Sequence, residues 1–132
     1  HPATPAPLWS RGLGDVYKRQ FRTSRPVEGT FDHNFCLADL RRDLAPAAQL
    51  SSTKSGLSMQ ISTTEPGLQL YTGQGLTGCG SSHGDHGNGP FAGICLEPQS
   101  WPDAPNNASF PSIDLAPGER YQQVSEFAFS QS

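Results

Sequence analysis

Apolar and polar residues alternate along several short stretches of the chain, and turn-forming residues separate these stretches. In the stretch LSMQIST, Leu57, Met59 and Ile61 alternate with serine and glutamine, which is the pattern of a strand buried on one face. The run AQLSS precedes it, and a turn from Thr53 to Gly56 lies between the two. Two short runs around a glycine-containing turn predict a β-hairpin.

Further strands are expected near residues 34–37, in GLQLYTG, in FAGICLE and in the C-terminal ERYQQVSEFAFS. The apolar run 94–96 predicts burial on both faces of its strand, and Pro98 predicts that strand pairing ends directly after Glu97. Only LADLRRDLAPAAQL has helical character, and Pro46 interrupts it. The pattern therefore predicts mostly antiparallel β-structure, as in one portion of a sandwich.

Length and composition narrow the class of protein. A chain of 132 residues is long enough for one domain, and a net charge of −3 with 16% charged residues indicates no nucleic-acid or anionic-membrane partner. No apolar run approaches the ~20 residues that a membrane span requires. The odd count of 3 cysteines argues against a disulfide framework and favours a reducing, cytoplasmic location. The oligomeric state is left open.

The first 20 residues differ in composition from the rest of the chain. HPATPAPLWSRGLG is typical of a linker, and the hexapeptide DVYKRQ at 15–20 is also the translation of a transposon end used as a sequencing adapter. We therefore expect residues 1–20 to be a linker or non-native segment and residues 21–132 to form the domain.

A glycine-rich segment contains four residues of types that bind zinc, namely Cys79, His83, Asp85 and His86. Their spacing matches no recognised zinc pattern, and the surrounding glycines would not preorganise them. We interpret the segment as a solvated loop and expect no metal site.

Asp32 and His33 are neighbours in FDHNF and invite comparison with a catalytic dyad. Adjacent side chains in an extended strand point to opposite faces, so the two are not expected to act on one substrate atom. One of them is expected to face a site and the other to face the structure.

Polar side chains and aromatic rings gather in TTEPGLQLYTG and CLEPQSWPDAPN, where we note Gln69, Tyr71, Glu97, Gln99 and Trp101. Sugar hydroxyls need partners that donate and accept hydrogen bonds, and the C–H faces of a sugar pack against aromatic rings. This combination is compatible with a sugar site, but strand ends with solvated side chains would show the same residues.

Four motifs resemble consecutive C-terminal motifs of the aldose 1-epimerase family. They are FDHNFCL, TTEPGLQLYTG, GICLEPQSWPDAPNNASFPS and LAPGERY, and FRTSRPV is similar to the segment before the first of them. The resemblance covers residues 21–129 in order. It implies an all-β fold, namely the C-terminal part of a large antiparallel β-sandwich whose N-terminal portion is missing from this chain.

The resemblance also implies an activity and residue roles. Members of the family interconvert the α and β anomers of free hexoses such as galactose and glucose, without a metal or an organic cofactor. Glu97 falls on the position of the catalytic base, while Asp32 and Gln69 fall on positions that bind the sugar. The family's acid is a histidine in an N-terminal Asn-His-x-Tyr motif, which this chain does not contain.

Two alternatives to this enzyme stay open from the sequence. A non-catalytic carbohydrate-binding β-sandwich could use the same pocket. A 1-epimerase of phosphorylated hexoses would need basic residues near the site, and the motifs place none there. In either case the expected partner is a small-molecule sugar.

Overall fold

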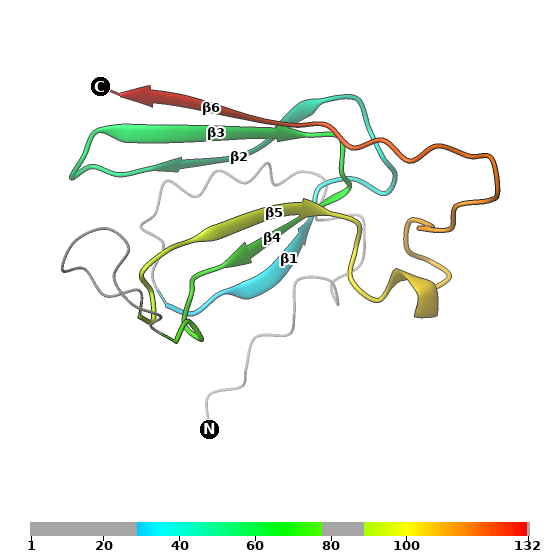
Figure 1. Cartoon of the computed structure of the whole chain (residues 1–132), viewed down its shortest axis with the longest axis horizontal. Coiled ribbons are helices and arrows are strands. Elements are labelled where there is room, and N and C mark those ends of the chain that lie inside the picture. Colours follow the sequence, from blue (N-terminus) through cyan, green and yellow to red (C-terminus); the bar gives the residue numbers. More distant parts are fainter. Residues whose placement is uncertain (1–28, 78–88, 132) are drawn as a thin grey trace.

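The computed structural model describes residues 29–77 and 89–131 and shows an all-β fold (Figure 1). The described elements are β1 (Asp32–Cys36), β2 (Ala45–Ser51), β3 (Leu57–Thr63), β4 (Gly67–Tyr71), β5 (Cys95–Gln99), the 3-10 helix η3 (Ala104–Asn106) and β6 (Ser125–Gln131). The strands form two antiparallel sheets, with the order β1-β4-β5 in sheet A and β2-β3-β6 in sheet B. The prediction of antiparallel β-structure is therefore confirmed. Within the described ranges, no helix is long and apolar enough to cross a membrane.

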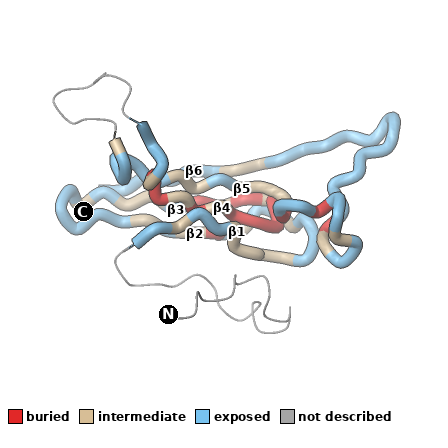
Figure 2. The backbone as a smooth tube through the Cα atoms, turned by 90° about the horizontal axis from the view of Figure 1, so that it is seen from below, coloured by how far each residue is buried: buried red, intermediate tan, exposed pale blue. Residues whose placement is uncertain are grey.

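The two sheets are stacked face to face, as Figure 1 shows with sheet B above sheet A and Figure 2 shows with the two overlapping. The apolar side chains Ile61, Leu68 and Leu70 are buried, with 0%, 3% and 5% of their surface exposed. Ile61 belongs to the middle strand of sheet B, and the two leucines belong to the middle strand of sheet A. Packing of apolar faces between two such layers is the basis of a β-sandwich.

The predicted hairpin is present as β2 and β3. Leu50 pairs with Met59 and Ala48 with Ile61, so the apolar residues of both strands share one face. The turn is closed by the amide of Gly56, which donates to the carbonyl of Ser52 at 2.9 Å. Gly56 has φ +70°, a conformation that glycine adopts without the steric cost of a Cβ atom.

The turn between β3 and β4 carries a buried carboxylate, Glu65, with 0% of its surface exposed. Glu65 forms an ion pair with Arg41 at 3.0 Å and accepts hydrogen bonds from the hydroxyls of Ser100 at 3.4 Å and Tyr121 at 3.3 Å. The Arg41 guanidinium also lies 3.7 Å from the centre of the Tyr121 ring. Burial, with the adjacent charge of Glu65, raises the pKa of the Tyr121 phenol, so Tyr121 keeps the proton that it donates. We refer to these four residues as the Glu65 cluster.

The apolar face of sheet B continues beyond the part that sheet A covers. Phe127 pairs with Ile61, and Phe129 pairs with Met59, so both phenylalanines belong to the face that carries Ile61. Phe127 is 48% exposed and Phe129 is 63% exposed, whereas Ile61 is fully buried. The end of sheet B that carries the C-terminus extends past sheet A in Figure 1, which explains this gradient.

The strand that contains Glu97 differs from its prediction in three ways. It begins at Cys95 rather than Phe91, and Ile94 is 41% exposed instead of buried. Pairing does not end at Pro98, because Pro98 pairs with Leu68 and the strand continues to Gln99. An edge strand tolerates proline because one side of its backbone needs no partner, and β5 is the outer strand of the described sheet A.

The segment 37–50, which showed helical character, contains no helix. Its second half forms β2, and the register shifts by one residue between Pro46 and Ala48. Such a bulge accommodates a proline on an edge strand, since the ladder is interrupted at that point. The C-terminal strand is also shorter than predicted. The prediction included Tyr121, but β6 begins at Ser125.

Candidate functional site

One face of sheet A carries the polar residues that the sequence singled out. Directly opposed residues in antiparallel strands share a face, and the register produces three rows across β1, β4 and β5. The rows are Asp32–Tyr71–Cys95, Asn34–Gln69–Glu97 and Cys36–Gly67–Gln99. The alternate residues of β4, Leu68 and Leu70, are buried on the other face. The polar face is therefore the outer one and is open to a ligand.

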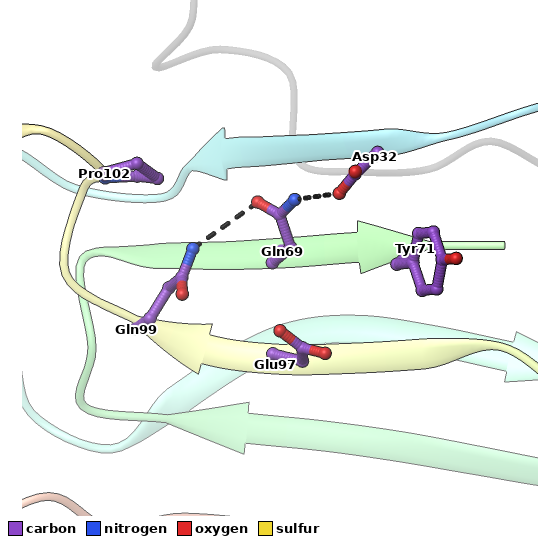
Figure 3. A pocket seen from close by; sticks show the side chains of 6 residues that line it. All are labelled: Asp32, Gln69, Tyr71, Glu97, Gln99 and Pro102. Carbon is purple, nitrogen blue, oxygen red and sulfur yellow. Dashed lines mark hydrogen bonds between the residues drawn. The ribbon is translucent and has the colours of Figure 1, made fainter. Parts of the chain in front are cut away.

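This outer face contains an open pocket of about 400 Å³, and Figure 3 shows the side chains around it. Its lining consists of Asp32, Gln69, Tyr71, Glu97, Gln99 and Pro102. The three residues expected to form the site, Asp32, Gln69 and Glu97, come from three different strands and are brought together here.

Asp32 and Gln69 form a direct pair on the outer face. The Gln69 side-chain amide donates to Asp32 Oδ1 at 2.7 Å. The Oε1 atom of Gln69 accepts from the Gln99 amide at 3.4 Å (Figure 3). A donor and an acceptor thus lie side by side, which suits a sugar hydroxyl because each hydroxyl both donates and accepts.

Glu97 lies directly opposite Gln69 in the middle row, and its side chain is exposed at the pocket. Its carboxylate makes no hydrogen bond or ion pair with any residue of the described segments. A carboxylate without a protein partner in a polar pocket is available to accept a proton from a ligand.

The backbone beside Glu97 is held from several directions. The Gln123 side chain donates to the carbonyl of Pro98 at 3.1 Å, and the Trp101 indole donates to the carbonyl of Pro66 at 2.9 Å. Ser100 donates to Glu65, as described above. The exit of β5 is therefore attached to the turn that joins the two sheets.

Trp101, which the sequence offers as an aromatic component of a sugar site, does not line the pocket. It is only 5% exposed and packs edge-to-face against Phe110 at 5.1 Å between ring centres. Tyr71 is the aromatic residue that lines the pocket. Its hydroxyl accepts from the amide of Gly75 at 2.8 Å, which fixes the ring against the following turn.

Asp32 and His33 lie on opposite faces, as the alternation of an extended strand predicted. Asp32 lines the pocket, and His33 pairs with Leu70 on the other face. His33 Nδ1 accepts the backbone amide of Asp32 at 3.0 Å. His33 is consequently not placed to exchange a proton with a ligand beside Glu97.

Comparison with known proteins identifies the family. The family model for aldose 1-epimerase matches residues 9–128. The chain belongs to the aldose 1-epimerase family. It is 42% identical over 128 residues to galactose mutarotase of Bos taurus and 36% identical over 110 residues to aldose 1-epimerase of Escherichia coli (strain K12). It also resembles the crystal structure of the GalM/aldose epimerase homologue from C. elegans, with a TM-score of 0.66 and 25% sequence identity.

The chain spans only part of these aldose 1-epimerase relatives. The matched segments cover 89% of this chain and 37% of the bovine protein, and 80% of this chain and 30% of the Escherichia coli protein. The structural match covers 77% of this chain and 30% of the C. elegans homologue. The chain matches the C-terminal portion of the family. Most of an aldose 1-epimerase domain therefore lies outside the matched segment.

The metal-like group of the sequence, Cys79, His83, Asp85 and His86, lies outside the described residues. Among residues 29–77 and 89–131, no group of three or more histidine, cysteine or acidic side chains could hold a metal ion. The two cysteines in these ranges, Cys36 and Cys95, are free thiols.

Two polar residues near the pocket were not assigned a role from the sequence. The sequence marks Gln99 only as a polar residue beside the aromatics, and it marks Asn34 only as the start of a predicted strand. The side-chain amide of Gln99 donates to Asn34 Oδ1 at 3.2 Å as well as to Gln69. The period-2 alternation of their strands could have placed both on the face of Asp32, but the contact between them depends on the register.

Proposed function

We propose that this chain is the C-terminal portion of an aldose 1-epimerase that interconverts the α and β anomers of free hexoses such as galactose and glucose. In this proposal Glu97 is the general base, and Asp32 and Gln69 bind sugar hydroxyls. The observation that carries the proposal is the meeting of these three side chains in one open pocket, where the Glu97 carboxylate has no partner among the described residues.

The proposed reaction needs one proton acceptor and one proton donor. Glu97 takes the proton of the anomeric hydroxyl while an acid protonates the ring oxygen, and the ring opens. Rotation about the C1–C2 bond followed by closure in the reverse sense yields the other anomer. The donor–acceptor pair of Asp32 and Gln69 holds the sugar during this rotation, so that the anomeric carbon stays near Glu97. A positioned base contributes about 10²–10⁴-fold to such a rate.

The acid is expected to come from the upstream portion of the domain. Of the histidines in the chain, His33 is the one within the described residues, and it lies on the opposite face of sheet A. The pocket is also open rather than enclosed in the described segments, which leaves room for upstream residues to complete it. We refer below to this chain together with that upstream portion as the full-length enzyme.

A phosphorylated hexose is a less suitable substrate for the described part of the site. The pocket lining includes two carboxylates, Asp32 and Glu97, and within the described residues it includes no lysine or arginine. Carboxylates repel a phosphate group, and phosphate sites are typically built from cations or helix N-termini. A neutral sugar matches this charge distribution better.

Exchange of Glu97 for glutamine tests the proposal because Glu97→Gln keeps the shape but removes the base. In the full-length enzyme, polarimetry of freshly dissolved α-glucose or α-galactose should show a rate lower by at least about 10²-fold. Near-normal mutarotation by this variant would show that another group is the base.

A sugar-binding protein without catalytic activity is the alternative, and the same experiment separates it. A binding protein would bind galactose without accelerating mutarotation, and Glu97→Gln would not change a rate that is already the uncatalysed one.

A cytoplasmic location is part of the proposal, and the free thiols of Cys36 and Cys95 support a reducing compartment.

A further inference from the structure

We propose that Gln99 and Asn34 are positioning residues, which set the orientation of the Gln69 side-chain amide in the sugar site. The inference rests on the proposed function, because it gives Gln99 and Asn34 a role through a residue that binds the sugar. It is carried by a continuous chain of side-chain hydrogen bonds across sheet A, from Asp32 to Asn34.

The charge of Asp32 decides the direction of every hydrogen bond in this chain. An ionised carboxylate can only accept, so Gln69 must present its NH₂ group to Asp32. The Oε1 atom of Gln69 then points away from Asp32 and needs a donor, which the NH₂ group of Gln99 supplies. The same NH₂ group donates to Asn34 Oδ1 at 3.2 Å. The hydrogen bonds among these four side chains therefore all fit one assignment of donors and acceptors.

Gly67 makes the contact between Asn34 and Gln99 possible. These two residues belong to β1 and β5, which are not neighbours but lie on either side of β4. Two strands that flank the same middle strand lie about 10 Å from each other. Their side chains can therefore meet across the middle strand only where that strand leaves space. A Cβ atom at Gly67 would lie 2.8 Å from Asn34 Oδ1 and 2.9 Å from the carbonyl oxygen of Gln99. The missing side chain of Gly67 is thus the space in which Gln99 reaches Asn34.

The orientation of Gln69 determines what the pocket offers to a sugar. In the observed orientation, one N–H of Gln69 donates to Asp32 Oδ1. Within residues 29–77 and 89–131, the second N–H of Gln69 and the second oxygen of Asp32 have no hydrogen-bond partner, so both can serve a ligand. In the reversed orientation an amide oxygen would face the carboxylate, which is repulsive, and the pocket would lose its donor. Gln99 opposes this reversal because it supplies the donor that Gln69 Oε1 requires. Asn34 holds that donor in place because its Oδ1 accepts a hydrogen bond from the same NH₂ group.

Two substitutions at Gln99 distinguish a role in orienting the Gln69 amide from a role in packing. Gln99→Met keeps the length of the side chain but cannot donate, so galactose should bind about two- to tenfold more weakly, as expected for the loss of one ordinary hydrogen bond. Gln99→Glu resembles glutamine more closely in shape, yet its carboxylate repels Gln69 Oε1 and favours the reversed amide. The glutamate variant should therefore bind galactose more weakly than the methionine variant, whereas a packing role predicts the opposite order.

A double-mutant cycle tests whether Gln99 acts through Gln69. The Kd for galactose and the KM and kcat of mutarotation are measured in the full-length enzyme for Gln99→Met, Gln69→Met and the double variant. If Gln99 only positions Gln69, Gln99→Met raises Kd and KM more than it lowers kcat, and it adds nothing in the Gln69→Met background. Additive losses would mean that Gln99 contacts the sugar directly, and no loss from Gln99→Met alone would mean that the hydrogen bond has no role. Either result would overturn the inference.

Variants at Asn34 and in sheet B complete the test. Asn34→Asp keeps an acceptor for the Gln99 amide and should bind galactose more tightly than Asn34→Leu, which keeps none. Gln60→Met is the matched control, because Gln60 is an exposed strand glutamine in sheet B with no side-chain hydrogen bond inside the described ranges. It should leave Kd and KM unchanged.

A readout without turnover separates this inference from the proposed function. The ¹⁵N-labelled side-chain NH₂ resonances of Gln69 should shift in Gln99→Met and in Asn34→Leu, but not in Gln60→Met. Unshifted Gln69 resonances would refute the inference even if the enzyme is active. Absence of mutarotation in the unsubstituted full-length enzyme would instead refute the proposed function, while the NMR result would still report on the amide orientation.

Discussion

Removal of Arg41 should destabilise the fold strongly, because it leaves the carboxylate of Glu65 buried without its counter-charge. Glu65 has no exposed surface, and Arg41 supplies both the 3.0 Å ion pair and the cation above the Tyr121 ring. Removal of one partner of a buried ion pair costs about 3–5 kcal/mol. The Arg41 side chain is 37% exposed, so water can partly replace it, and we expect a loss near the lower limit of about 3 kcal/mol.

The assay is urea unfolding of the full-length enzyme, with Arg41→Ala compared with Arg120→Ala. Arg120 is an exposed arginine for which no ion pair is seen within the described segments, so its removal should change the free energy of unfolding by less than about 0.5 kcal/mol. The double variant Arg41→Met/Glu65→Leu should recover most of the stability lost in Arg41→Ala, because no charge is then left buried. Equal, small losses of stability in Arg41→Ala and Arg120→Ala would show that the buried Glu65 carboxylate does not depend on the charge of Arg41.

Two further predictions concern the 132-residue chain alone, and a third concerns the full-length enzyme. Expressed alone, the chain should melt without a sharp cooperative transition and should not accelerate mutarotation. It should also bind a hydrophobic dye at the exposed face of Phe127 and Phe129. A cooperative transition together with a rate enhancement would contradict this prediction. A chain that starts at Phe21 should show the same thermal profile as the 132-residue chain, since residues 1–20 are expected to contribute nothing to the fold. A thermal profile shifted to lower temperature would refute that expectation. In the folded full-length enzyme, burial, and then the charge of Asp39, raises the pKa of the Cys36 thiol, so at pH 8 iodoacetamide should modify Cys36 more slowly than a free cysteine, with a rate that rises as the pH increases; an ordinary rate at pH 8 would contradict it.

The local elements follow closely from the sequence. The alternation of Leu57, Met59 and Ile61 and the turn at Gly56 specify the hairpin, because a period of two places every second side chain on one face whatever lies beyond it. The same alternation of side chains places Asp32 and His33 on opposite faces of β1. The site residues Asp32, Gln69 and Glu97 were assigned by their resemblance to family motifs, and the structure places all three in one pocket, although their roles stay predictions.

Pairing between distant strands could not be read from the sequence. The end of β5 was misplaced because a proline that stops an inner strand is accepted at an edge, and the position of a strand in its sheet depends on the rest of the fold. Trp101 was considered for the pocket because its motif is polar, yet its indole is buried and donates to Pro66.

The sequence by itself determined which residues alternate, where the chain turns and which motifs carry carboxylates and amides, since these properties depend on neighbours within a few residues. Only the tertiary structure decided that Gln99 lies opposite Gly67 and so reaches Asn34, because strand register is set by contacts between distant segments. The same holds for the burial of Glu65, which no pattern in the sequence indicates. Its burial follows from contacts with Arg41 and Tyr121, which lie 24 residues before it and 56 residues after it in the chain and reach it only when the two sheets stack.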